Sequence, residues 1–231
     1  MGATVARTLN PEAHAVRRDA FVDVAERMIQ LKGYDSLSIQ EILDELGASK
    51  GAFYHYFGSK AALLEAVIDR MVDAGMAALA PVLADDKLTA IQRLNGIFAG
   101  IASFKGERTE LILAVMDVWL ADDNAIVREK FRKGIGPRLR PLLAQIVEQG
   151  QTEGGFVSGR PDDIARVLVS FIQSNTEAAT ELYFARRSNA ISFEDVERAF
   201  EAYREAVERI LGLPDGSFYA VDRKTLRHWF G

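Results

Sequence analysis

Apolar residues recur three and four positions apart through almost the whole of this 231-residue chain. Because an α-helix has about 3.6 residues per turn, that spacing places them along one helical face. We find no convincing run in which apolar and polar residues alternate, as they do in a half-buried strand. The chain is therefore predicted to be all-α.

The composition is that of a globular protein with a sizeable core, with 48% hydrophobic residues and a formal net charge of −5. There is no cysteine, which excludes disulfides and thiolate metal sites. The first residues lack the continuous apolar core of a signal peptide, and no apolar run approaches membrane-spanning length. We therefore expect a cytoplasmic protein with no membrane partner.

Enzymatic motifs are missing from the sequence. The three histidines are widely separated, and neither H-E-x-x-H, G-x-S-x-G nor a nucleotide-binding fingerprint occurs. Acidic pairs stand at predicted helix starts, where the helix dipole favours them. We predict no catalytic residue, no metal site and no cofactor.

The N-terminal third contains short helices bounded by caps and glycines. Residues 1–15 are expected to form a flexible arm, because they are mixed in character and include Pro11. A first helix follows over 16–32, and Ser38 with Glu41 fits a capping box that opens a second. Gly47 ends it, and Ser49 is a good N-cap for a third. Residues 16–58 therefore predict a helix-turn-helix domain. The buried face of the first helix is predicted to hold Phe21, Val24, Ala25, Met28 and Leu31.

The rest of the chain reads as longer helices. They are predicted near 59–81, 88–104, 107–120, 123–150, 161–187 and 192–211, and together they form a second domain over 59–212. The C-terminal tail, 213–231, contains Leu226, Trp229 and Phe230. Packing of these side chains back on a dimer, a partner site and a frayed end all stay open for it.

The segment SKGAFYHYFGSK, residues 49–60, carries four aromatic residues and no acid. Phe53 shares one helical face with Tyr56 and Phe57, whereas Lys50, Gly51, Tyr54 and His55 fall toward the other side. A DNA major groove accepts a helix with such a surface. Net charge adds no support, since residues 1–60 hold 7 basic and 8 acidic residues. An ordinary core helix is the alternative.

Residues 16 to about 68 resemble the N-terminal domain of the TetR family of transcriptional regulators. The shared features are Gly33-Tyr34, Ser38-Ile39, Gly47, Ser49-Lys50-Gly51, Phe53-Tyr54-x-Tyr56-Phe57 and Ser59-Lys60. The resemblance implies that the third helix enters the major groove of double-stranded DNA. It makes Lys50, Gly51, Ala52 and Tyr54 candidate base or groove contacts, and Ser38, Gln40, Ser49, Tyr54, His55 and Lys60 candidate phosphate contacts. Many relatives carry threonine in place of Ala52, so one hydroxyl contact is missing here.

Two late helices are suited to an interface between copies. Over 161–187 two neighbouring apolar stripes form a wide arc, which can face a core and a partner at once. Over 192–211 apolar residues recur at helical spacing beside alanines that allow close approach. The resemblance implies that these helices form a four-helix bundle across a homodimer. A thick monomer core is the alternative.

The resemblance also implies a pocket for a small-molecule effector in the second domain. Polar residues within apolar stripes, and the aromatic or methionine side chains beside them, mark the candidates: Asn95, Phe98, Met116, Trp119, Phe171 and Asn175. Each also fits a core or interface position. We expect a repressor that binds a palindromic operator and is released by an unidentified, small and largely apolar ligand. The alternative is a DNA-binding protein of the same fold that has no ligand switch and recruits protein partners.

Overall fold

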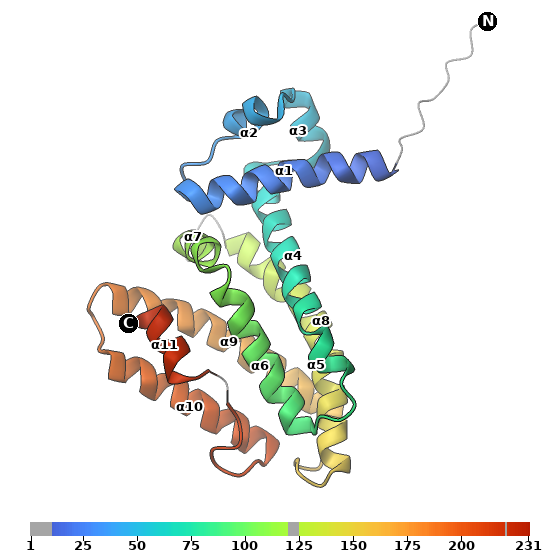
Figure 1. Cartoon of the computed structure of the whole chain (residues 1–231), viewed down its shortest axis with the longest axis vertical. Coiled ribbons are helices and arrows are strands. Elements are labelled where there is room, and N and C mark those ends of the chain that lie inside the picture. The colour runs from blue at the N-terminus through green and yellow to red at the C-terminus, as the bar shows by residue number, and fades with distance from the viewer. Residues whose placement is uncertain (1–10, 120–124, 220) are drawn as a thin grey trace, which may run out of the picture. The chain divides into compact units, whose positions relative to one another are not determined.

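A computed structural model describes residues 11–119, 125–219 and 221–231 (Figure 1). All regular elements within these ranges are helices, which confirms the all-α prediction. The chain divides into two compact units. Unit 1 consists of Met1–Met71 and Thr109–Glu129, and unit 2 of Val72–Arg108 and Lys130–Gly231. The boundary placed at residue 58 from the sequence therefore differs from the observed division, in which each unit is assembled from two stretches of the chain.

Unit 1 is built on the long helix α1 (Pro11–Lys32). The helices α2 (Ile39–Leu46) and α3 (Lys50–Tyr56) follow it, and the first part of α4 (Lys60–Ala78) and α7 (Thr109–Trp119) complete the unit. α1 packs against both α2 and α7, and α2 packs against α3. The most deeply buried side chains of this unit are Phe21, Val22, Ala25, Ile29, Ile42, Phe53, Leu63 and Val67.

The first helix begins at Pro11, five residues before the predicted start at Val16. The flexible-arm prediction is therefore wrong for residues 11–15, and residues 1–10 lie outside the described residues. Proline is favoured in the first turn of a helix, because its missing N–H has no partner there in any case. Glu12 adds an acid near the positive end of the helix dipole.

The buried face of α1 also differs from the prediction at one end. Phe21, Val24 and Ala25 are buried as expected, but Leu31 is 76% exposed and Ile29 is fully buried in its place. Both residues fit a helical spacing from Phe21. The neighbouring helices decide which of the two overlapping stripes is covered.

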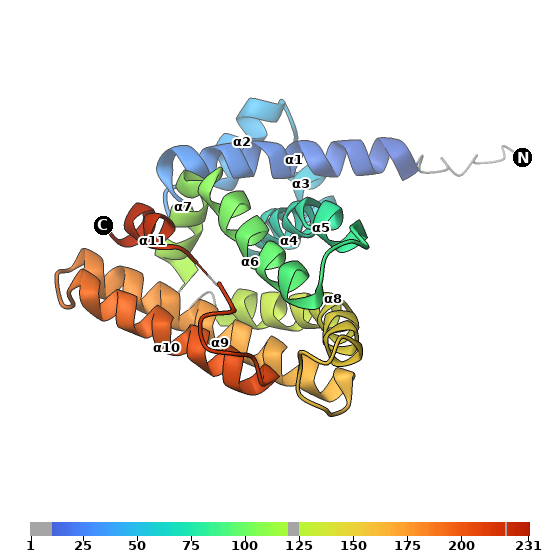
Figure 2. The same ribbon diagram turned by 60° about the horizontal axis from the view of Figure 1, so that its bottom comes forward.

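Unit 2 contains α5 (Ala80–Ala84), α6 (Ala90–Gly106), most of α8 (Ala125–Thr152), α9 (Pro161–Arg187), α10 (Phe193–Leu211) and α11 (Arg223–Phe230). α9 and α10 run side by side, and α11 packs against both (Figures 1 and 2). The core gathers apolar residues from α6, α8, α9 and α10. No helix among the described residues combines the length and apolar character needed to cross a membrane.

The C-terminal residues are part of the packed structure. Phe218 is fully buried in the core of unit 2. On α11, Leu226 and Phe230 form a second apolar cluster with Val196 and its neighbours. Of the alternatives left open for 213–231, the frayed end is wrong over 213–219 and 221–231, where the residues pack on their own chain, and packing on a dimer stays a prediction.

Candidate functional site

The third helix of unit 1 is anchored by its aromatic side chains. Phe53 is fully buried. Its ring centroid lies 5.8 Å from that of Phe21 and 5.7 Å from that of Phe57. Tyr56 adds a further ring contact with Phe21, at 5.8 Å. These contacts bury one face of α3 and set the rotation of the helix about its axis.

The opposite face of α3 is open. Lys50, Gly51 and His55 are exposed, Tyr54 is 48% exposed, and Ala52 is half-buried beside them. The helix contributes no acidic side chain. This face therefore offers an ammonium group, a phenol and an imidazole around a glycine that exposes the backbone.

Serine hydroxyls cap the N-termini of α2 and α3, as predicted. Ser49 Oγ accepts a hydrogen bond from the backbone N–H of Ala52 at 3.2 Å. Ser38 Oγ accepts one from the Glu41 N–H at 3.3 Å and donates to Glu41 Oε2 at 2.7 Å. The same carboxylate oxygen accepts from the Ser38 N–H at 2.9 Å, which completes the capping box.

Two other predicted phosphate contacts have partners inside unit 1. Gln40 Nε2 donates to Asp44 Oδ1 at 2.7 Å. Lys60 Nζ donates to the carbonyl oxygen of Asp35 at 3.3 Å and lies 4.2 Å from the ring centroid of Tyr34. Burial lowers the pKa of Lys60, and the charge of Asp35 opposes that shift. A phosphate contact by Gln40 or Lys60 would exchange one of these internal partners for DNA.

The acidic side chains of the first two helices are largely neutralised within unit 1. The ion pairs are Arg70 with Asp23 and Glu26, Arg27 with Glu45, and Lys32 with Glu41. An acidic module can approach DNA when its negative charges are paired or turned aside. The ion pairs above pair four carboxylates of unit 1 with a cation: Asp23, Glu26, Glu41 and Glu45.

Glu41 makes the stability of unit 1 depend on pH. Hydrogen bonds from Lys32 and then from Ser38 lower the pKa of Glu41 from 4.5 to about 2. A lowered folded-state pKa means that the ionised carboxylate stabilises the fold above about pH 4.5. That stabilisation is lost as the pH falls toward about 2. We expect Glu41→Gln to melt below the wild type at pH 7, with the gap closing as the pH falls to 2, as thermal melts followed by circular dichroism would measure. A gap of equal size at every pH would contradict this role.

His14 belongs to the same region, although no sequence pattern had placed it there. Its ring centroid lies 5.4 Å from that of His55 and 4.7 Å from that of Tyr56. His14 stands on the first turns of α1, which the sequence had assigned to a flexible arm. The pair Pro11-Glu12, a typical helix start, was the available signal.

The six predicted effector contacts belong to two different units. Met116 and Trp119 stand on α7 in unit 1. The other four, Asn95, Phe98, Phe171 and Asn175, stand on α6 and α9 in unit 2.

Within unit 2, three of these candidates have partners from the chain itself. The Phe171 ring stacks on Tyr203, with centroids 4.8 Å apart. The Phe98 ring meets that of Phe218 edge-on at 4.9 Å. The side-chain amide of Asn95 binds backbone groups of the C-terminal residues.

Known proteins share both the local motif and the wider fold. Residues 21–67 match the family model described as bacterial regulatory proteins, tetR family. The chain is 23% identical over 174 residues to the HTH-type transcriptional repressor KstR2 of Mycolicibacterium smegmatis, a match that covers 75% of this chain and 82% of that protein. A 55-residue stretch is 44% identical to an uncharacterized HTH-type transcriptional regulator of Lactococcus lactis, covering 24% of this chain and 28% of that one.

Among solved structures, the fold is similar to that of the Rhodococcus erythropolis transcriptional repressor QsdR, from the TetR family. The TM-score is 0.54 at 15% identity, and the match covers 87% of this chain and 97% of that one. At this identity the likeness concerns the fold alone. It extends well beyond residues 21–67, since it covers 87% of the chain.

Proposed function

We propose that this chain is a transcriptional regulator of the TetR family, which binds a palindromic DNA operator as a homodimer and represses transcription there. The observation that supports this most is the open, acid-free face of α3, whose rotation is fixed by the buried ring of Phe53. A helix of this kind fits the major groove, which is about 12 Å wide.

The proposed contacts divide into two groups. Lys50, Gly51, Ala52 and Tyr54 approach base edges and the groove wall. Ser38, Gln40, Ser49, Tyr54, His55 and Lys60 contact phosphates around them. The capped N-termini of α2 and α3 suit an anionic backbone, because free N–H groups and the positive end of the helix dipole lie there.

The proposed dimer forms through α9 and α10. One side of α9 carries exposed residues at helical spacing, among them Val167, Ser170, Ser174 and Ala178. Val167 is 52% exposed, so it adds apolar surface to this face. Small side chains on this face allow a second copy of the helix to approach closely. Two copies of α3 would then read half-sites about one helical turn of DNA apart, or a multiple of it.

Release by a small-molecule effector completes the proposal. The effector must bind more tightly to the form that does not bind DNA, because only differential affinity shifts an equilibrium. One observation favours the alternative of a regulator without a ligand switch: the amide of Asn95 and the ring of Phe98 are already engaged by the chain itself. If a hydrophobic compound raised the melting temperature and abolished operator binding, that result would favour a ligand-responsive regulator over one without a ligand switch.

The first test of DNA recognition is selection of bound duplexes from random DNA at moderate salt. We expect enrichment of an inverted repeat, since two identical helices related by a twofold axis read the same sequence on opposite strands. Recovery of unenriched DNA would refute sequence-specific recognition through α3.

Gly51 allows a sharper test. A Cβ built on Gly51 would have a single neighbour within 4 Å, Ser49 Oγ at 3.9 Å, so the fold does not require glycine there. We expect Gly51→Ala to stabilise the protein by about 0.4–1 kcal/mol. The added methyl group should nevertheless weaken operator binding about tenfold or more, because it holds the backbone away from DNA. Chemical denaturation and a binding titration measure the two effects.

Gly134 provides the matched control. It is an exposed glycine inside α8, and a Cβ built there would meet nothing within 4 Å. Gly134→Ala is expected to give a similar gain in stability without changing operator affinity. Equal operator affinity in both variants would show that Gly51 does not face DNA.

A further inference from the structure

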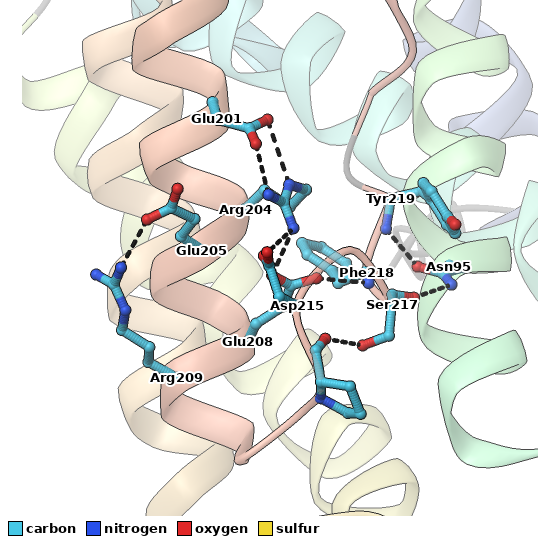
Figure 3. A network of polar contacts seen from close by, with 11 residues as sticks. Asn95, Glu201, Arg204, Glu205, Glu208, Arg209, Asp215, Ser217, Phe218 and Tyr219 are labelled. Carbon is cyan, nitrogen blue, oxygen red and sulfur yellow. Dashed lines mark hydrogen bonds and ion pairs between the residues drawn. The ribbon is translucent and has the colours of Figure 1, made fainter.

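The chain segment that follows α10 crosses unit 2 as a bound peptide would. We call residues 213–219 the strap. It leaves α10 at Gly212, whose φ is 69°, and runs between α10 and α6 (Figure 3). The Phe218 side chain is fully buried in the core, with its ring edge-on to Phe98 at 4.9 Å. Tyr219, the next residue, is 66% exposed.

Two side chains recognise the backbone of three successive strap residues. Asn95 Nδ2 donates to the carbonyl oxygen of Ser217 at 3.1 Å, and Asn95 Oδ1 accepts from the Tyr219 N–H at 2.8 Å. Between them, the Phe218 N–H donates to Glu208 Oε1 at 2.9 Å. Figure 3 shows these groups converging on the strap from α6 on one side and α10 on the other.

The carboxylate of Glu208 is held in place independently of the strap. Glu208 is 3% exposed, and its Oε2 accepts a bond from Arg204 at 2.5 Å. Arg204 also binds Glu201 on α10 at 2.5 Å and Asp215 of the strap at 3.2 Å. If the strap left, Glu208 would keep its arginine, whereas Asn95 would lose both partners.

We propose that Asn95, Phe98 and Glu208 form a binding site for an aromatic ring next to an amide group, occupied by Phe218, and that an effector of this class binds by displacing the strap. The effector role rests on the proposed function. Phe218 is then a resident ligand in the same chain, and an external compound competes with it for one site.

The polar groups around Phe218 determine which chemical class of ligand the site would bind. A hydrocarbon ring alone would fill the space beside Phe98 but would leave the Asn95 amide and the Oε1 atom of buried Glu208 without their present partners. A site built to hydrogen-bond a ligand discriminates strongly against analogues that lack those groups. N-acylated aromatic compounds supply a ring, a carbonyl acceptor and an N–H donor together.

Displacement of the strap would affect the packing of α9 and α10, the helices of the proposed dimer interface. The strap leads on to α11, which packs against both α9 and α10. A ligand that displaces the strap therefore removes the non-covalent anchor of the segment that precedes α11. Because α11 packs on α9 and α10, binding of the ligand would thereby affect the packing of the helices assigned to the interface.

The test is hydrogen exchange of the full-length protein, with N-acetylphenylalanine methylamide as probe and N-acetylalanine methylamide as matched control. Peptides covering the strap report whether the Phe218 and Tyr219 amides lose protection. We expect exchange there to rise about tenfold or more with the phenylalanine probe and to stay unchanged with the alanine probe. Unchanged protection at the highest soluble concentration of the phenylalanine probe would overturn the proposal.

Variants test the chemical class. Phe218→Ala empties the ring site, so it should bind the phenylalanine probe at least about tenfold more tightly than the wild type. Adding Asn95→Leu should remove most of that gain, while Tyr219→Ala should behave as the wild type. If Phe218→Ala does not fold, Phe218→Leu serves instead. Equal binding of toluene and the amide probe would overturn the assignment to aromatic amides.

Operator binding, measured on the same samples, separates this proposal from the proposed function. Strap displacement with weaker operator binding supports both. Displacement without any change in operator affinity would overturn the effector role of the site. A wild type that selects no operator refutes the proposed function, while the exchange measurement still decides whether the strap is displaceable.

Discussion

Replacing Phe53 with alanine is expected to lower the free energy of unfolding by about 3–5 kcal/mol. Phe53 is fully buried, and its ring contacts those of Phe21, Phe57 and Tyr54. The cavity would stand between α1 and α3, beside Phe57. Because a domain is usually stable by only about 5–15 kcal/mol, this loss is a large fraction of the total. Urea unfolding followed by circular dichroism measures it.

The next residue along α3 is the control. Tyr54 is 48% exposed and touches Phe53 edge-on at 5.3 Å, so Tyr54→Ala should cost about 1 kcal/mol or less. It should nevertheless weaken operator binding, because it removes a side chain from the open face. Phe53→Ala is expected to impair both properties. Similar unfolding midpoints for the two variants would contradict the assignment of the faces of α3.

Replacing Glu208 with alanine is expected to cost about 2–4 kcal/mol. The carboxylate is almost completely buried, and it is the acceptor for the buried N–H of Phe218. Its loss leaves that N–H unpaired, opens space beside α10 and takes one partner from Arg204. The strap should also lose protection from hydrogen exchange, which distinguishes this effect from general loosening of unit 2.

Glu201 is the matched control for Glu208. Both carboxylates bind the same guanidinium group, but the Glu201 side chain is 58% exposed. Exposed ion pairs contribute about 0–1 kcal/mol, so Glu201→Ala should have little effect on stability. The hydrogen bond with Glu201 is the main cause that raises the pKa of Arg204, yet the exposure of Glu201 limits what that pair contributes to stability. Equal losses for the two variants would mean that burial of Glu208 is unimportant.

The local features of α3 were predictable because they depend on neighbours along the chain. Phe53 and Phe57 stand four residues apart, so they share a face in any α-helix, and both are buried. Ser49 and Ser38 precede their helices at the N-cap position, and their hydroxyls find backbone N–H groups within the next three residues. The start of α1 was missed because Pro11 was interpreted as a breaker, when it occupies the first turn.

The surroundings of Asn95 were not predictable in the same way. A polar residue among apolar ones on α6 indicated that the amide needs a partner in an enclosed place, which is correct. The candidates from the sequence were an effector, the core or a dimer interface. Its partners are the backbone groups of Ser217 and Tyr219, which the sequence gives no means of pairing with it.

The sequence by itself determined the helical class, the caps, the short helices of the N-terminal domain and the side of α3 that is free. These follow from contacts between residues three and four positions apart, whose geometry a helix dictates. Only the tertiary structure decided that Leu31 stays exposed while Ile29 is buried, and that Phe218 fills the place beside Phe98. The reason is that burial and pairing between distant residues depend on which helix faces become neighbours, and no spacing along the chain encodes that choice.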